Sequence, residues 1–362
     1  MTQFLEVMKP DHIIKDQLLQ VMIDNEWSDI FITVWAYPAI KIGGNIVNID
    51  EWISKFTDKD TEDFAKSIIT EDQHQILLRD RNLDFSFTFQ DRRFRTNISF
   101  QMWRYMVVSR LLTADIPHID DLWLPSIYTD VCKKGQWLIL VTWPTWSGKT
   151  TTLWAMIDFI NENYSKHIIT IEDPIEYVHP HKKSIIEHKE IWKDVPDYET
   201  ALIWAMRQAP HVILFWEMRN KQEMEMALRL AETGHLVFST LHTRSSYQTI
   251  TRILDSFSWE DKSQIRMQLA DSLIAVFSQR LLKLSNARGV KMAKEILVKN
   301  SAVANLIREN DLHQLPSVIQ MGQNEGMQLL ETDIIDFIRK WEITKEEWLK
   351  FSNSPKLVEE SI

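Results

Sequence analysis

The feature that most constrains this chain is the octapeptide at residues 143–150, which reads Trp-Pro-Thr-Trp-Ser-Gly-Lys-Thr. Its second half fits the phosphate-binding pattern G-x-x-x-x-G-K-[ST], in which backbone N–H groups surround phosphate oxygens, the lysine contacts the β and γ phosphates, and the hydroxyl binds Mg²⁺. Gly148, Lys149 and Thr150 fit this pattern, but Trp143 stands where the first glycine belongs. A bulky residue there costs about 1–2 kcal/mol, because the backbone must adopt φ > 0 close to the ligand.

Glycine and tryptophan both occur in abnormal numbers. The chain has 8 Gly and 15 Trp among 362 residues, whereas glycine usually makes up about 7% of a protein. Taken together, the two counts come close to that usual glycine content. Trp27, Trp137 and Trp341 also lie in polar turn or helix-end contexts where glycine is common. We therefore hypothesise that most tryptophans are glycines in the cell, encoded by UGA; UGG codons at positions 143 and 146 would exclude this.

Composition and charge limit the class of protein. A length of 362 residues suggests two or three domains. The formal net charge of −10 gives nucleic acid no general electrostatic attraction, and we expect no nucleic-acid partner. The single cysteine, Cys132, excludes an internal disulfide and a Cys₄ zinc site and favours a reducing, cytoplasmic setting. No apolar run approaches the roughly 20 residues of a membrane span, and the first residues lack a signal-peptide hydrophobic region, so we expect membrane contact only through partners.

The first part of the chain predicts a small α+β domain over residues 1–112. Helices are expected near residues 12–25 and 60–78. Short apolar or alternating segments between and after them predict strands at 29–34, 39–42, 45–49, 84–89, 93–100 and 105–112. Residues 113–127, which include two prolines, are predicted to form a linker.

From residue 137 onward, apolar strands alternate with helices, which is typical of a parallel α/β core. We predict this core over residues 128–285, with strands at 137–142, 167–171, 212–215 and 236–240. The phosphate-binding loop joins the first of these strands to a helix at 151–161, and a helix N-terminus favours phosphate. Beyond about residue 259 the chain is predicted to be mainly helical, at 261–280, 302–308, 328–340 and 345–351. Residues 286–362 are therefore expected to form a C-terminal, mainly helical region.

Polar residues follow three of the predicted core strands, as expected for an open α/β sheet with a ligand site at one edge. Glu172, Asp173 and Glu176 follow the strand at 167–171, and a carboxylate there could polarise an attacking water or hold Mg²⁺. Glu217 follows four apolar residues, as in a Walker B strand, with Trp216 where a glycine would let the chain turn. The alternative for each is a solvated acidic turn or strand end.

Two histidines, His235 and His242, flank the predicted strand at 236–240. A zinc pair would need a third ligand, and none lies at a recognisable spacing. Taken alone, the two histidines would by default be ordinary core or surface histidines. They matter because they complete a series of four polar segments along one predicted sheet. The other three are the phosphate-binding loop, the acidic residues after the strand at 167–171, and Glu217.

These four segments resemble the type IV pilus retraction ATPases, the PilT-like branch of the secretion ATPase superfamily. The resemblance covers nearly the whole chain. It rests on the Walker A loop at 143–150, the aspartate box at 170–177, the Walker B segment at 212–219 and the histidine box at 231–243. Reading tryptophan as glycine restores Gly-Pro-Thr-Gly-Ser-Gly-Lys-Thr, Gly-Glu-Met-Arg and, at 122–125, Leu-Gly-Leu-Pro.

The resemblance implies a fold, an assembly and a set of roles. The fold would be an α/β RecA-like P-loop core with an N-terminal PAS-like α+β domain. Six copies would form a ring that binds ATP between neighbouring subunits and powers pilus retraction and twitching motility. By alignment with the family, Glu176 would activate water, and Thr150 and Glu217 would hold Mg²⁺, partly through water. Further catalytic roles fall on Arg95, Arg110, His235 and His242, and nucleotide contacts on Trp143, Pro144, Thr145, Trp146, Ser147, Gly148, Lys149, Thr150 and Thr151.

The implied partners are an inner-membrane pilus platform protein and a paralogous pilus ATPase, which would place the protein at the inner face of the membrane. One signature departs from the family pattern: residues 302–308 read Ala-Val-Ala-Asn-Leu-Ile-Arg and lack its first arginine. Two other readings stay open. One is a type II secretion or competence-pilus ATPase, and the other is a non-catalytic ring subunit, should Trp143 and Trp146 be genuine.

Overall fold

The computed structural model describes residues 15–42, 45–49, 54–112, 116–142, 149–286 and 289–361. It divides into two compact units. Unit 1 comprises Met1–Asp115 together with Asp173–Val178, and unit 2 comprises Ile116–Glu172 and His179–Ile362. The chain therefore passes between the units at three points along its sequence, and each unit is described separately below.

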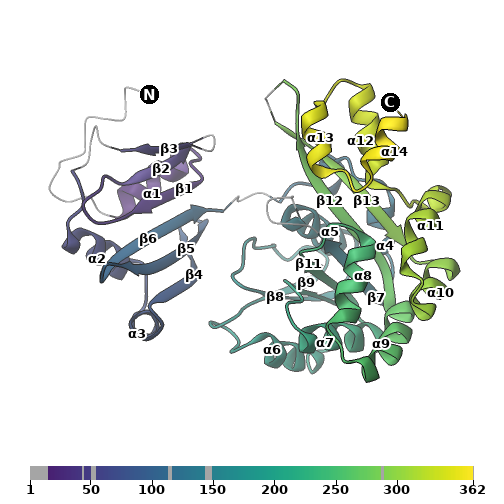
Figure 1. Cartoon of the computed structure of the whole chain (residues 1–362). Coiled ribbons are helices and arrows are strands. Elements are labelled where there is room, and N and C mark those ends of the chain that lie inside the picture. The colour runs from purple at the N-terminus through teal and green to yellow at the C-terminus, as the bar shows by residue number, and fades with distance from the viewer. Residues whose placement is uncertain are drawn as a thin grey trace. The chain divides into compact units, whose positions relative to one another are not determined.

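Unit 1 is an α+β unit built on a six-stranded sheet of order β3-β2-β1-β6-β5-β4, whose strands are all antiparallel (Figure 1). Its strands are β1 (Asp29–Ile32), β2 (Ala39–Ile42), β3 (Asn45–Asn48), β4 (Asn82–Phe89), β5 (Arg92–Gln101) and β6 (Arg104–Leu111). Its helices are α1 (Lys15–Asp24), α2 (Asp58–Ser67) and α3 (Glu71–Asp80). The single helix predicted over 60–78 is thus two helices, because Thr57 and Thr70 each begin one with a capping box.

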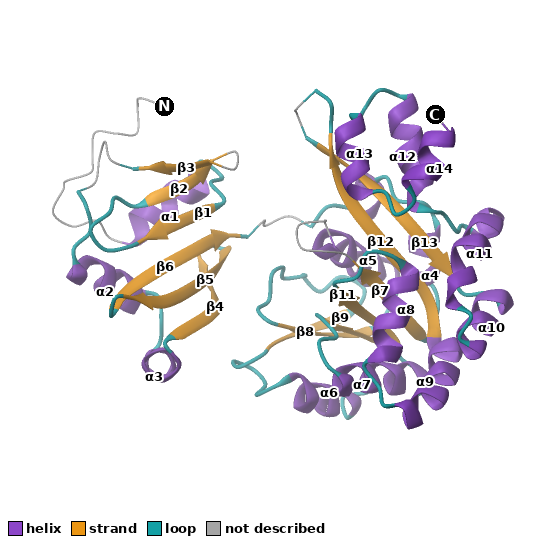
Figure 2. Cartoon of the chain, viewed as in Figure 1, coloured by secondary structure: helices purple, strands orange, loops and turns teal. Residues whose placement is uncertain are grey.

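Unit 2 contains a seven-stranded sheet of order β13-β12-β7-β11-β10-β8-β9 (Figure 2). Its strands are β7 (Trp137–Thr142), β8 (His167–Glu172), β9 (Ile185–Glu190), β10 (Val212–Phe215), β11 (Leu236–Leu241), β12 (Leu273–Lys283) and β13 (Val290–Val298). All pairings are parallel except that of β12 with β13. The inner strands β7, β8, β10 and β11 are almost completely buried, which explains their mainly apolar sequences, whereas the edge strand β9 is partly exposed and carries polar residues.

The helices of unit 2 pack around this sheet. The first part of unit 2 contains η1 (Ile119–Leu122), α4 (Ile127–Cys132), α5 (Lys149–Asn163), α6 (Tyr198–Met206), α7 (Lys221–Glu232), α8 (Ser246–Asp255) and α9 (Trp259–Ser272). The C-terminal part, green to yellow in Figure 1, contains α10 (Ser301–Glu309), η2 (Leu312–Gln314), α11 (Leu315–Met321), η3 (Gly322–Glu325), α12 (Leu330–Arg339), α13 (Lys345–Phe351) and α14 (Pro355–Ser361). The predicted fold class, α/β with an N-terminal α+β part and a helical C-terminal region, is confirmed.

One predicted element is wrong. The helix expected over 261–280 ends at Ser272, and the next residues form β12. Six of the eight residues from Leu273 to Arg280 are apolar or small, and all eight are buried on both faces of the strand, so no alternation marks them as a strand. Strands β9 and β13 were also not predicted, and β13 continues the sheet beyond residue 285.

Six tryptophans adopt positive φ in the described part of the chain: Trp35, Trp103, Trp123, Trp137, Trp192 and Trp341. Positive φ is a genuine outlier for a bulky residue and routine for glycine. Trp103 follows Met102 in the turn between β5 and β6, where both φ values are positive as in a type I′ turn. Trp341 follows α12, where Glu342 N–H donates to Phe337 O at 2.9 Å in the Schellman pattern that usually places glycine at this position. The backbone thus supports glycine at these positions independently of composition.

We expect Trp341→Gly to stabilise the folded protein by about 1–2 kcal/mol, because glycine relieves the left-handed backbone strain. Trp259→Gly is the matched control, since both side chains are 87% exposed but Trp259 begins α9 and is not among the positive-φ residues. The Trp259→Gly variant should not be more stable than the parent, because glycine is a poor helix residue. Urea unfolding midpoints at constant slope measure both changes, and equal shifts for the two variants would contradict the strain argument.

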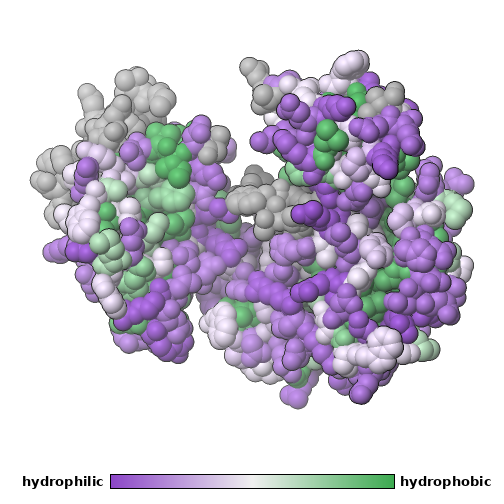
Figure 3. Space-filling model, in the orientation of Figure 1, coloured by the Kyte–Doolittle hydropathy of each residue, from purple (hydrophilic) through white to green (hydrophobic). Residues whose placement is uncertain are grey.

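The visible surface is mostly hydrophilic, although unit 1 carries a hydrophobic group over β2 and β3 (Figure 3). Ile42, Ile46 and Val47 are exposed there. None of the helices in the described part of the chain has the length and hydrophobicity of a membrane span.

Candidate functional site

The predicted phosphate-binding loop leads from a buried strand into a helix. β7 is buried from Leu138 to its end at Thr142, and α5 begins at Lys149. Trp143, Pro144, Thr145, Trp146, Ser147 and Gly148 lie outside the described residues, as does the side chain of Lys149. Thr150 and Thr151 occupy the first turn of α5 and are partly exposed. A 15-residue helix following a parallel strand offers free N–H groups and a positive dipole end to an anion.

Glu217 and His242 meet beyond the carboxyl ends of two neighbouring strands. β10 ends at Phe215 and its neighbour β11 ends at Leu241. The His242 Nε2 atom lies 3.2 Å from Glu217 Oε1, and the Arg219 Nε atom lies 2.9 Å from Glu217 Oε2. Because β11 also pairs with β7 in parallel, this carboxylate stands at the same sheet edge as the start of α5. The structure therefore brings together two of the predicted site residues and adds a cation, Arg219.

His235 does not join this group. It precedes β11 at its amino end, where its Nδ1 atom lies 3.0 Å from Leu230 O, and its carbonyl accepts a hydrogen bond from Trp137 N–H. His242 is seven residues after His235, which corresponds to about 23 Å of extended chain. The two predicted histidines thus stand at opposite edges of the sheet.

Glu176 lies in unit 1, with Arg95. The Arg95 Nη1 atom is 3.9 Å from Glu176 Oε1, and Nη2 donates to Asp84 Oδ2 at 2.7 Å. Burial alone would lower the pKa of Arg95, but the hydrogen bond to Asp84 and the nearby carboxylates raise it above its usual value. Arg95 therefore stays cationic beside the predicted base.

Arg110 stands directly opposite Arg95 on the neighbouring strand. Its Nε atom donates to Asp29 Oδ1 at 2.7 Å, and the Asp29 side chain is almost fully buried. Opposite residues of an antiparallel pair share one face of the sheet. The two arginines predicted from the resemblance therefore lie next to each other on one face of the unit 1 sheet, each paired with a carboxylate.

Arg93 was missed by the sequence reasoning. Its Nε atom donates to Ile175 O at 3.1 Å, and its guanidinium also bonds Ser86 Oγ. Arg93 precedes Arg95 by two residues and therefore points to the same face of β5. That alternation was the available signal: arginines at every second position of a strand that carries a predicted site residue. Arg93 and Arg95 together hold the Asp173–Val178 segment to unit 1.

No group of three or more His, Cys, Asp or Glu side chains among the described residues is arranged to hold a metal ion on its own. The carboxylate of Glu217 and the hydroxyl of Thr150 are oxygen ligands of the kind that Mg²⁺ prefers, and Mg²⁺ is usually held by one or two carboxylates together with substrate phosphates. These residues therefore fit a metal that arrives with a nucleotide.

Comparison with known proteins agrees with this architecture. Residues 125–337 match the family described as type II/IV secretion system protein. A twitching motility protein of Neisseria gonorrhoeae is 39% identical over 323 residues, covering 89% of this chain and 84% of the relative. The type IV pilus retraction ATPase PilT of Pseudomonas aeruginosa is 36% identical over 320 residues, covering 88% and 92%. A crystal structure of the pilus retraction motor PilT with bound ADP superposes with a TM-score of 0.90 at 40% identity, covering 96% of this chain and 100% of that one. This chain belongs to the type II/IV secretion system protein family, and within it to the branch of the pilus retraction ATPases.

Proposed function

We propose that this protein is a Mg²⁺-dependent ATPase that works as a ring of six identical subunits and drives retraction of a type IV pilus. The observation that carries the proposal is the Glu217–His242 pair, at the sheet edge where α5 begins. The match over 89% of the chain to a twitching motility protein supports the choice of pilus retraction over secretion.

The nucleotide fits this sheet edge if residues 143 and 146 are glycines. The backbone of residues 143–148 would then surround the phosphates, and Lys149 would contact the β and γ phosphates. Thr150 and Glu217 would complete the Mg²⁺ shell. The positive φ of six tryptophans elsewhere in the chain supports glycine at the tryptophan positions in general.

Unit 1 supplies the remaining groups. Glu176 would act as a general base toward the attacking water, and Arg95 and Arg110 would stabilise charge on the transferring phosphoryl group. In a ring, unit 1 of one subunit would serve the nucleotide of its neighbour, so nucleotide turnover would move domain pairs in sequence. His242, paired with Glu217, and His235, at the other end of β11, would link nucleotide state to domain position.

The proposed partners are an inner-membrane pilus platform protein and a paralogous pilus ATPase, which would bring the protein from the cytoplasm to the inner face of the membrane. The formal net charge of −10 fits a basic partner surface better than nucleic acid. Measuring the assembly mass of purified protein with and without nucleotide tests the ring, for which six subunits are expected.

Three matched proteins test the ATPase proposal. The first carries glycine at all fifteen tryptophan positions and is called the glycine-restored protein below. The second restores tryptophan at 143 and 146 only, and the third is the chain as printed. We expect phosphate release from Mg·ATP by the first protein alone, because tryptophan fills the space that the phosphates need. A folded glycine-restored protein without hydrolysis would refute the motor.

A further inference from the structure

The two ends of the Asp173–Val178 segment are held together by one imidazole ring in unit 2. The segment leaves unit 2 after Glu172 and returns at His179. His188, on β9, contacts both of these flanking residues. It pairs with Thr170 in the parallel β8–β9 register, which places its ring beside the end of β8.

The hydrogen bonds of His188 assign its tautomer. His179 N–H donates to His188 Nε2 at 3.1 Å, and a backbone N–H can only donate, so Nε2 carries no proton. Nδ1 therefore carries the proton and lies 2.8 Å from Thr170 Oγ1 and 3.2 Å from Glu172 Oε1. The Thr170 hydroxyl in turn donates to Glu172 Oε1 at 2.7 Å. One neutral ring thus joins the residue before the segment to the residue after it.

This group is buried and well supported. The side chains of Thr170 and Glu172 are fully buried. The rings of His179 and His188 stack with centroids 5.7 Å apart and an interplanar angle of 5°. Burial lowers the pKa of His179, which disfavours the charged form of that ring. A buried and mutually bonded set of this kind holds its members in one arrangement.

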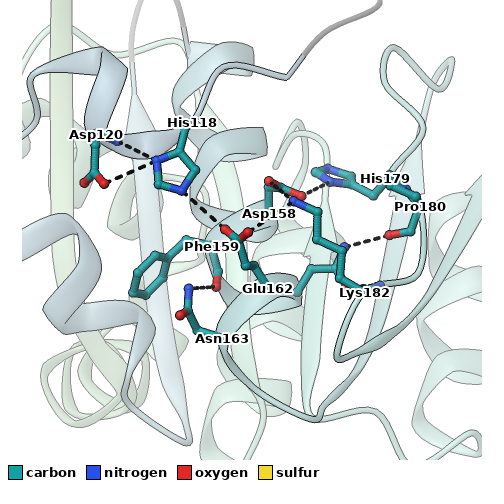
Figure 4. Close-up of polar contacts among 10 residues, drawn as sticks. His118, Asp120, Asp158, Phe159, Glu162, Asn163, His179, Pro180 and Lys182 are labelled. Atoms are coloured by element: carbon teal, nitrogen blue, oxygen red, sulfur yellow. Dashed lines mark hydrogen bonds and ion pairs between the residues drawn. The ribbon is translucent and has the colours of Figure 1, made fainter.

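Helix α5 holds the returning chain from the other side (Figure 4). Asp158 lies 3.4 Å from His179 Nδ1 and accepts a hydrogen bond from Lys182 Nζ at 2.8 Å. Asn161 donates to Pro180 O at 2.8 Å and accepts from Lys182 N–H at 3.2 Å. These contacts lie on the helix that begins at Lys149. The return point of the segment is therefore fixed to the helix that follows the phosphate-binding loop.

We propose that His188 is a positioning residue for ATP hydrolysis, because it fixes both points from which the segment carrying Glu176 extends. Glu176 is four residues after Glu172 and three before His179, so the chain tethers it within about 11 Å of His179. With both ends fixed, the segment keeps few backbone arrangements, and a base must stand within hydrogen-bond reach of its water. This inference rests on the proposed ATPase function and on the role of Glu176 in it.

Two substitutions in the glycine-restored protein separate the bonds of His188 from its bulk. His188→Gln retains an acceptor for His179 N–H and a donor toward Thr170, because an amide has both groups. His188→Leu keeps comparable volume and loses both bonds. We expect His188→Leu to lower kcat at least tenfold with the Kd for ATP within twofold of the parent, and His188→Gln to stay within threefold in kcat. His167→Leu is the control, since His167 stands at the opposite end of β8 and contacts Gln208 O and Glu187; its kcat should stay within twofold.

Hydrogen exchange at the His179 amide tests, without any activity measurement, whether His188 holds this end of the segment through the bond from His179 N–H. Exchange should be slow in the parent and in His188→Gln and at least tenfold faster in His188→Leu, whatever the ATPase result. Failure of the ATPase proposal and failure of the proposed role of His188 are therefore distinguishable.

Should His188→Leu not fold, Thr170→Val removes only the hydroxyl between His188 and Glu172 and should lower kcat at least threefold. Unchanged kcat in a folded His188→Leu or, failing that, in Thr170→Val would overturn the proposal. So would an equal loss in His188→Gln and His188→Leu.

Discussion

Lys149→Ala in the glycine-restored protein is expected to lower ATP turnover at least a hundredfold. The lysine is the one cation that the loop pattern directs at the β and γ phosphates, and removing one such electrostatic contact typically costs a factor of about 10² to 10³ in kcat. Phosphate release at saturating Mg·ATP measures this change. A parallel binding experiment with ADP should show weaker affinity as well, because the β phosphate is contacted in both nucleotides.

Lys134→Ala is the matched control for this experiment. Lys134 is an exposed lysine just before β7, the strand on the other side of the loop. Its removal changes the net charge equally but touches no predicted phosphate contact, so turnover should be unaffected. Normal hydrolysis by Lys149→Ala would mean that the nucleotide does not bind at the start of α5.

Glu176→Gln is expected to bind ATP with nearly unchanged affinity while hydrolysing it about 10² to 10⁴ times more slowly. A positioned general base typically contributes a factor of this size, and the amide cannot accept the proton from water. The substitution also removes the charge 3.9 Å from Arg95, a partly exposed pair worth at most about 1 kcal/mol. Single-turnover phosphate release together with equilibrium ATP binding separates the two effects.

Asp84→Asn controls for the loss of charge around Arg95. Asp84 is the nearer carboxylate of that arginine, at 2.7 Å, and carries no predicted role in proton transfer. It should change kcat less than tenfold. If Glu176→Gln instead abolished ATP binding, Glu176 would be a structural residue of the segment that Arg93 and Arg95 hold.

Most of the sheet edge could be predicted because parallel strands place their carboxyl ends together. Apolar runs followed by polar residues marked β7, β8, β10 and β11, and the structure brings Glu217 and His242 within 3.2 Å of each other. The same pattern already put His235 before β11 and His242 after it, and only the family resemblance assigned His235 to the site. Its position one residue before β11, rather than after it, is what separates it from the other site residues.

Other features depended on contacts that are remote in sequence. β12 is buried on both faces, so its apolar run carried no period that could distinguish a strand from the end of α9. His188 lies in an edge strand with mixed polar residues, and its role follows only from Thr170, Glu172 and His179 meeting around one ring. The assignment of the Asp173–Val178 segment to unit 1 is likewise a matter of tertiary packing and has no local signature.

The assignment of residues 173–178 to unit 1 determines how the two units can be separated by cleavage or exchanged between related proteins. A cut in the polypeptide near residue 115 does not separate the two units, because six residues of unit 1 are encoded within unit 2. If the N-terminal domain were exchanged between relatives, the arginines of β5 would come from one protein and residues 173–178 from the other. Both would come from the same protein only if residues 173–178 were exchanged as well. Productive chimaeras should therefore need two crossover regions, and the arginines of β5 should covary with this hexapeptide rather than with the rest of unit 2.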